Sequence, residues 1–181
     1  MRKLFLTHIL FLIAAFFIGN SYAITVKQVG QVADDTAITA QIKAQYAQDK
    51  LLDSFDIHVA TKQNIVYLSG TVETDMQYEK AVTIAESTDS VDDVNANGLK
   101  VKDSKSPLSD TLITAKIKGL ILKDKTLNTA TRNSDVSVET KDGVVYLSGT
   151  VSSSDQKNYI QKLVKSVKNV KNVNSDDLNV E

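Results

Sequence analysis

Two serines in this sequence have neighbours that suggest a nucleophile. The heptapeptide VYLSGTV occurs at residues 66–72 and again, unchanged, at 145–151, and it places Ser69 and Ser148 directly before a glycine. A serine nucleophile needs a histidine within hydrogen-bonding reach to take its proton. The first copy has His58 on the preceding β run, but the second copy has a serine at the matching position. We therefore interpret both serines as parts of a strand and His58 as a solvated surface residue.

Other reactive groups are equally scarce. The sequence has no cysteine, which excludes disulfides, thiol catalysis, Cys-zinc sites and a lipid-acceptor cysteine. Asp89, Asp92 and Asp93 lack the alternating spacing and the turn glycine of a calcium loop, so we interpret them as a solvated helix end. No glycine-rich phosphate loop occurs. We expect no enzyme activity, no metal, no cofactor and no small-molecule substrate.

The N-terminus reads as an export signal. Arg2 and Lys3 precede an apolar run at 9–18, and Ser21-Tyr22-Ala23 supplies the small residues of a cleavage site. This pattern predicts a signal peptide over residues 1–23 and a periplasmic protein without a lipid anchor. The apolar run is too short to span a bilayer comfortably.

The remainder is built from two copies of one unit. DTAITAQIK from Asp35 matches DTLITAKIK from Asp110 at an offset of 75, and from Asp56 onward the offset is 79. The second copy therefore has four extra residues, which we place in a loop at 128–134. We expect two small domains rather than a solenoid. The predicted parts are a lead-in at 24–33, a domain at 34–102, a linker at 103–108 with the only proline, and a domain at 109–181.

Each copy predicts the element order α-β-β-α-β. Asp35 or Asp110 is placed to cap a first helix whose apolar stripe would face the core. Two β runs follow, at 56–62 and 65–72 in the first copy, and a separator of only two residues predicts a tight hairpin. A second helix is expected from about Asp75 or Asp155, and a last strand from about Leu99 or Leu178.

The hairpin register assigns the members of the heptapeptide to two faces. Val59 should lie opposite Leu68, and Ile57 opposite Gly70, which places the valines, Leu68 and Gly70 under the helices. Gly70 and its equivalent Gly149 would let a helix cross closely or the strand bulge. Tyr67 and its equivalent Tyr146 point outward, where they could join the domains or meet a partner.

These motifs resemble the BON domain family. The resemblance is carried by DTxITxxIK, VxLxGxV, a Gln early in the second helix (Gln77, Gln156) and the closing VxxVxNxxLxV, in both copies. Ser90 and Asn169 stand where that family usually has glycine. The resemblance implies an α+β fold, in which each domain is a three-stranded mixed sheet with two helices on one face. Tandem copies behind a signal peptide resemble the OsmY-type periplasmic members.

The second helix differs in charge between the copies. On a helical wheel the apolar Ile160, Leu163, Val164 and Val167 fall on one side. The other side, which we call the lysine face, consists of Lys157, Lys162, Lys165 and Lys168. The first copy has Glu79, Glu86 and Asp89 there. The lysine face is open to three interpretations: a solvated surface, an interdomain contact, or attraction to anionic lipid headgroups, where each lysine adds about 1 kcal/mol.

The first helix also differs. The second copy has Leu112, Leu120 and Leu122 where the first has Ala37, Gln45 and Ala47, and Lys116, Lys118 and Lys123 flank these leucines. Leucines among lysines fit a surface that dips into a bilayer interface, and they fit interdomain packing equally well. Residues 24–102 carry 7 Lys and 12 Asp or Glu, against 12 Lys or Arg and 10 Asp or Glu in 103–181. The net acidity after the leader disfavours nucleic acid as a partner.

The family resemblance implies a role at the cell envelope. Its members are associated with phospholipid or envelope surfaces, with osmotic or envelope stress, and in some cases with chaperone-like activity. We therefore expect a non-enzymatic exported protein that binds anionic phospholipid or a membrane surface, mainly through the second domain. The alternative is a periplasmic chaperone-like or adaptor module that binds envelope proteins through Tyr67 and Tyr146.

Overall fold

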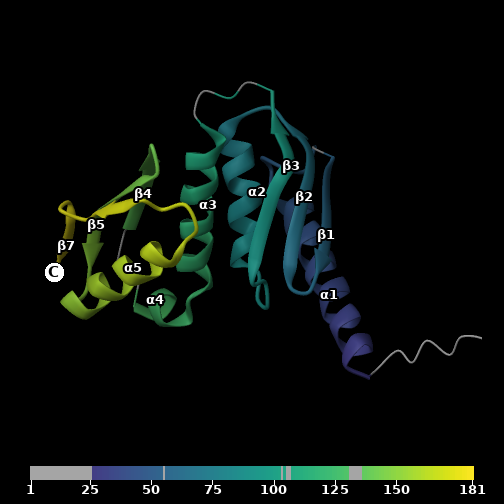
Figure 1. Ribbon diagram of the computed structural model, residues 1–181, viewed down its shortest axis with the longest axis horizontal. Coiled ribbons are helices and arrows are strands. Elements are labelled where there is room, and N and C mark those ends of the chain that lie inside the picture. The colour runs from purple at the N-terminus through teal and green to yellow at the C-terminus, as the bar shows by residue number, and fades with distance from the viewer. Residues whose placement is uncertain (1–25, 55, 103, 105–106, 131–135) are drawn as a thin grey trace, which may run out of the picture.

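The computed structural model describes residues 26–54, 56–102, 104, 107–130 and 136–181, which form two tandem α+β domains (Figure 1). The predicted signal peptide and residues 131–134 of the predicted loop lie outside this part of the chain, whereas residues 128–130 of that loop belong to a short helix instead. The first domain contains α1 (Val26–Gln48), β1 (Ile57–Lys62), β2 (Ile65–Val72), α2 (Asp75–Ser87) and β3 (Asp93–Val101). The second contains α3 (Leu108–Lys123), α4 (Lys125–Ala130), β4 (Val136–Lys141), β5 (Val144–Val151), α5 (Ser154–Ser166), β6 (Asn172–Asn174) and β7 (Leu178–Val180).

Both sheets are mixed and have the predicted topology. β2 lies at the centre of the first sheet, antiparallel to β1 and parallel to β3. In the second sheet β5 is antiparallel to β4, and β6 and β7 together take the place of one parallel strand. The predicted register is confirmed, because Val59 pairs with Leu68 and Ile57 with Gly70.

Alternate residues of the repeated heptapeptide lie on the inner face of each sheet. Val66, Leu68 and Val72 are almost completely buried in the first core, as are their counterparts in the second. Gly70 has a φ of +120°, and a Cβ there would lie 2.5 Å from the carbonyl oxygen of Asp56 on the neighbouring chain segment. Gly149 has a φ of +108°. The sequence left two explanations for this glycine, a strand irregularity or a close helix crossing. Its positive φ and the nearby carbonyl oxygen show that the strand irregularity requires glycine and that helix crossing does not.

The predicted capping role of Asp35 and Asp110 is wrong. Asp35 lies well inside α1, and α3 begins two residues before Asp110 without a side-chain cap. Each carboxylate instead accepts hydrogen bonds from both backbone N–H groups of its domain's hairpin turn. In the first domain these belong to Gln63 and Asn64, each at 2.9 Å. Both turns have positive φ values, so their amides point together toward one acceptor.

In the second domain β7 begins at Leu178 as predicted, after the short separate strand β6 at Asn172–Asn174. In the first domain the last strand begins earlier than predicted, at Asp93 rather than near Leu99. Its early residues include asparagines, which are rare in strands and hide the β pattern. Pairing with the central strand decides the conformation there, and Val94 is fully buried. Ser90 and Asn169, at the usual glycine positions, both adopt positive φ, at 67° and 72°.

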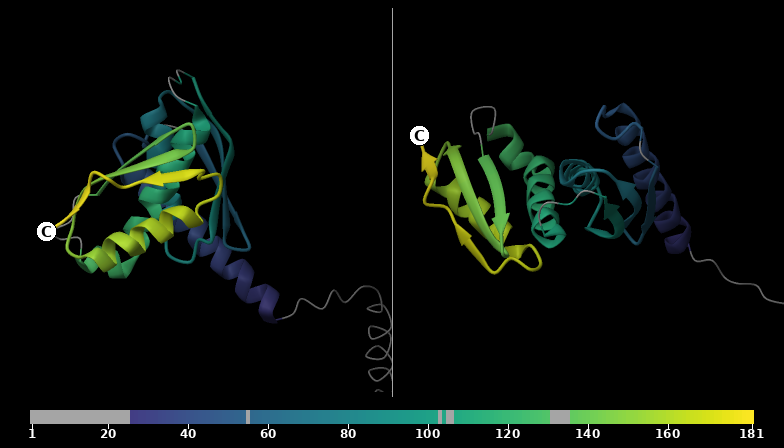
Figure 2. Two further views of the ribbon diagram at one scale, coloured as in Figure 1. Left: turned by 60° about the vertical axis from the view of Figure 1, so that its left-hand side comes forward. Right: turned by 90° about the horizontal axis from the view of Figure 1, so that it is seen from above.

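Helix α3 stands between the domains. Figure 1 shows α3 between α2 and the second sheet, and the view from above in Figure 2 shows the same neighbours. The first helix of the second domain therefore packs on its own sheet through one side and on α2 through another. We call the α2–α3 contact the interdomain seam.

Candidate binding surfaces

The interdomain seam is closely packed because small residues of α3 face α2. Ala115 is completely buried and belongs to the core of the first domain, and Leu112 packs against the same core. The Thr83 hydroxyl donates to the Ala115 carbonyl oxygen at 3.3 Å. A Cβ added to Gly119 would lie 2.5 Å from the Cβ of Glu86. Any larger residue at 119 would therefore push the two helices apart.

Three lysines of α3 extend across the seam to the first domain. The Lys118 ammonium pairs with the Glu79 carboxylate at 2.5 Å. Lys116 pairs with Asp93, and Lys123 donates to the carbonyl oxygen of Val91. The acidic side of α2 thus meets cations from α3.

Glu86 is a buried acid at the centre of this seam. Its side chain is 3% exposed, and its Oε2 has no hydrogen-bond partner within the described part of the chain. Burial raises the pKa of the Glu86 carboxyl to about 7, and the nearby Asp93 carboxylate adds to this rise. Lys116 and Lys123 act in the opposite direction but do not cancel the effect of burial.

The residues of α3 that were predicted to bind lipid or a partner therefore lie in different environments. Leu112, Lys116, Lys118 and Lys123 all contact the first domain. Leu120 is partly buried against the core of the second domain. Only the side chain of Leu122 is mainly exposed, at 55%.

Sequence reasoning missed Gly119 and Glu86 as parts of the seam. Gly119 was detectable in principle, because glycine inside a helix costs about 1 kcal/mol relative to alanine and usually marks close packing. The first copy has Ala44 at the matching position. Glu86 carried no such signal, because an isolated glutamate on a helix ordinarily lies in water.

The lysine face is largely exposed. Lys162, Lys165 and Lys168 are exposed, while Ile160, Val164 and Val167 are buried in the second core. Lys157 is half-buried and donates to the carbonyl oxygen of Leu178 at 2.5 Å. No ion pair joins Lys162, Lys165 or Lys168 to an acidic side chain in the described ranges. The seam covers part of the matching acidic face of the first domain, where Glu86 is buried and Glu79 is paired, while Asp89 stays exposed.

The two tyrosines lie on the outer faces of the sheets. Tyr67 is 41% exposed and Tyr146 45%, each on the central strand of its sheet. Neither is in the seam, so they do not join the two domains.

The outer face of the first sheet also brings together a serine, a histidine and an aspartate. The register places Ser69 directly opposite His58, and the His58 Nδ1 lies 3.7 Å from the Asp56 carboxylate. Their side chains are well solvated, with Asp56 92% exposed. A hydrated carboxylate does not orient an imidazole as the buried acid of a catalytic triad does. The second copy pairs Ser148 with another serine, Ser137, so the arrangement is not repeated.

The described residues offer neither a metal site nor a membrane-spanning helix. No group of three or more His, Cys, Asp or Glu side chains is placed there to hold a metal ion. No helix in the same part of the chain is long and apolar enough to cross a bilayer.

Comparisons with known proteins agree with the two-domain architecture. The family model described as "BON domain" matches residues 34–103 and 109–181. Osmotically-inducible protein Y of Escherichia coli (strain K12) is 38% identical over 163 residues, which cover 87% of this chain and 79% of that protein.

Solved structures give a weaker likeness. Two structures of CdsD, a structural protein of the type III secretion system of Chlamydia trachomatis, align with a TM-score of 0.33 at 12% and 13% identity. The alignments cover 81% of this chain and 67% and 63% of the CdsD chains, and at that TM-score they carry no argument. The two family matches and the extended identity are decisive: this chain belongs to the BON domain family and contains two BON domains.

Proposed function

We propose that this is a non-enzymatic periplasmic protein of the osmotic or envelope stress type, whose second domain contacts anionic phospholipid surfaces through the lysine face. One observation carries the proposal. This side of the second helix is basic and exposed in the second domain, whereas in the first domain Glu86 is buried in the seam, Glu79 is paired with Lys118, and only Asp89 is exposed. The name of the E. coli relative supports the osmotic part of the proposal, and the predicted leader supports export.

The charge on this face suits a reversible contact. Each exposed lysine near an anionic bilayer contributes about 1 kcal/mol, so Lys162, Lys165 and Lys168 together supply roughly 3 kcal/mol. That is too little for permanent anchoring and falls as salt screens the surface. The lysines of α3 already contact the first domain, so the proposed lipid contact rests on the lysine face alone.

Vesicle flotation tests the proposal. The protein is mixed with vesicles of phosphatidylglycerol and phosphatidylcholine, or of phosphatidylcholine alone, at low and at 0.5 M salt. We expect flotation with the anionic vesicles at low salt only, and a loss of at least tenfold in the triple variant Lys162→Glu, Lys165→Glu, Lys168→Glu.

The matched control is Lys43→Glu, Lys62→Glu, Lys100→Glu, three exposed positions of the first domain. It changes the net charge of the protein by the same amount, so it isolates the position of the charges from their sum. Equal recovery of the wild type and the lysine-face triple variant would contradict the proposal, as would equal losses in both triple variants.

A protein-binding module is the second candidate. It is favoured by the tyrosine that stands exposed at the middle of each outer sheet face. Aromatic side chains on an open surface are common at protein interfaces. A module of this kind would give no flotation specific to anionic vesicles, so the same experiment separates the two candidates.

A further inference from the structure

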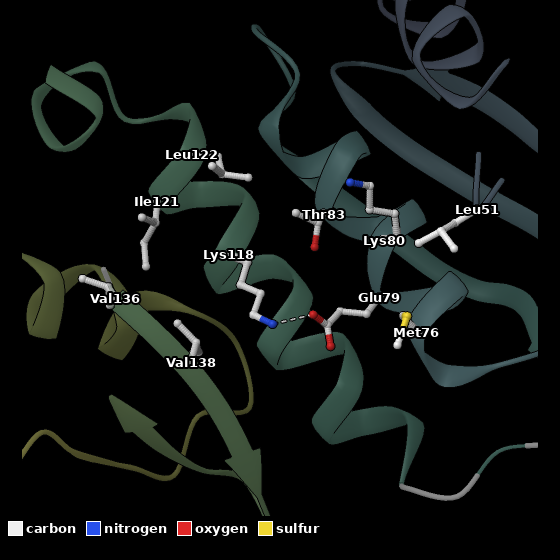
Figure 3. A pocket seen from close by; sticks show the side chains of 10 residues that line it. All are labelled: Leu51, Met76, Glu79, Lys80, Thr83, Lys118, Ile121, Leu122, Val136 and Val138. Atoms are coloured by element: carbon white, nitrogen blue, oxygen red, sulfur yellow. Dashed lines mark hydrogen bonds and ion pairs between the residues drawn. The ribbon is translucent and has the colours of Figure 1, made fainter. Parts of the chain in front are cut away.

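An apolar groove runs beside the edge of the second sheet. It has a volume of about 350 Å³ and lies between β4, the C-terminal half of α3, and α2 (Figure 3). Its apolar lining consists of Leu51, Met76, Ile121, Leu122, Val136 and Val138. Met76 is 67% exposed, an unusual position for a large apolar side chain without a partner.

The charges around this groove are already neutralised. Figure 3 shows Lys118 reaching across it to Glu79, and Lys80 pairs outside the lining with Asp49 at 3.1 Å. An anionic headgroup would have to compete with these carboxylates. The remaining lining therefore favours an uncharged apolar occupant.

The edge of β4 supplies unpaired backbone groups at the same place. Lys141 and Val144 flank a two-residue turn and form the hydrogen-bonded pair that closes the hairpin. Bonded pairs alternate along the ladder, so the N–H and C=O groups of Val136 and Val138 point away from β5. Within the described residues, β4 has no strand partner other than β5.

We propose that an extended polypeptide segment docks here by adding a strand to β4. Every second side chain of an added strand would continue the inner face of the sheet, and beyond β4 that face opens into the groove. Backbone hydrogen bonds would hold the segment, and alternate apolar side chains would fill the groove. This site is separate from the lysine face and from Tyr67 and Tyr146.

The first domain has a hollow at the corresponding place, but its lining is more polar. Tyr46 and Ala47 stand where the second domain has Ile121 and Leu122. Tyr46 is buried, and its hydroxyl donates to the carbonyl oxygen of Ala81 at 2.8 Å. The hollow that remains beside β1 is lined partly by charged residues, including Lys43, Asp53 and Asp56. The apolar groove is thus particular to the second domain.

Fluorescence anisotropy without lipid tests this site. The probe is a fluorescein-labelled nonapeptide of alternating valine and serine, compared with the same peptide N-methylated at alternate residues on its hydrogen-bonding edge. We expect saturable binding of the first peptide, with at least a tenfold loss on N-methylation. Met76→Glu and Leu122→Glu should each cause a similar loss, because both place a carboxylate in the groove at an exposed position.

The matched control is Ala47→Glu, the exposed equivalent of Leu122 in the first domain, which should bind as the wild type does. Thermal melts establish that each variant is folded. Unchanged binding in Met76→Glu and Leu122→Glu, or equal binding of the N-methylated peptide, would overturn the proposal. So would a result in which these variants abolish only vesicle flotation, or only self-association in sedimentation.

The lysine-face variant separates this proposal from the lipid contact. It should lose flotation and keep peptide binding, since Lys162, Lys165 and Lys168 do not line the groove. Loss of both functions in that variant would contradict the assignment of two sites.

Discussion

Asp35 and Asp110 were correctly predicted to be structural residues, but they were assigned the wrong structural role. An aspartate before an apolar helical stripe suggests a helix cap, because that inference uses only neighbouring residues. The observed partners are turn amides 28 to 33 residues away, such as the Asp142 N–H at 2.7 Å from the Asp110 carboxylate. The hydrogen bond from the Asn64 N–H, above all, holds the pKa of the Asp35 carboxyl below its usual value. Each aspartate therefore fastens the first helix of its domain to the hairpin.

Titration of the Glu86 carboxyl should change the free energy of unfolding. Its pKa rises from 4.5 to about 7 in the native state, so the native state binds this proton more tightly than the unfolded chain does. The stability gained from the proton is fully present below about pH 4.5 and is lost as the pH rises through 7.

Replacement of Glu86 by glutamine should remove this pH dependence. The amide stays neutral, so Glu86→Gln should have a free energy of unfolding about 1–3 kcal/mol above the wild type at pH 8, and close to it at pH 4.5. Urea unfolding at the two pH values measures the difference, with the exposed Glu139→Gln as control. A difference that is the same at both pH values would show that Glu86 is not held protonated by burial.

At the scale of elements, helix α3 holds the two domains together because it packs against both of them. Its sequence is apolar well beyond one stripe, which is typical of a helix buried on more than one side. Sequence alone could not show whether the second partner was a bilayer or the other domain. That choice depends on contacts between residues far apart in the chain, such as Ala115 in the first core.

Gly119 gives a direct test of the seam. Gly119→Leu should separate α2 from α3, because its side chain would overlap Glu86 and the carbonyl oxygen of Thr83. We expect a larger radius of gyration in small-angle X-ray scattering and a loss of about 1–3 kcal/mol in stability. Ala44→Leu, at the exposed equivalent position of α1, should change neither. An unchanged radius in Gly119→Leu would contradict the observed packing.

Other elements were predictable because local signals agree with the fold. The two-residue separators set the register of both hairpins, and Gln77 forms the capping box with Thr74 that starts α2. The lysine face was visible from a helical wheel, and its exposure follows from that pattern. The β4 groove was not visible, because its walls come from both domains.

At the scale of the whole molecule, comparison of the two copies distinguishes residues that build the fold from residues that are candidates for function. The heptapeptide that is identical in the two copies forms the central strand of each sheet, and its alternate residues line the inner sheet face. The parts that differ are α3, which closes the seam, α5, which exposes lysines, and the side chains beside β4. Duplication followed by divergence at these places gives a second domain whose surfaces the first domain does not have.

The absence of cysteine allows the proposed membrane contact to be tested with a single labelled cysteine. A single cysteine at Lys162, Tyr146 or Lys100 can carry an environment-sensitive fluorophore on the lysine face, the outer sheet face or the first domain. With phosphatidylglycerol vesicles we predict a blue shift and increased emission at position 162 only, reversed by 0.5 M salt. A shift at 146 or 100 without one at 162 would contradict the proposal that the second domain meets the membrane through its lysine face.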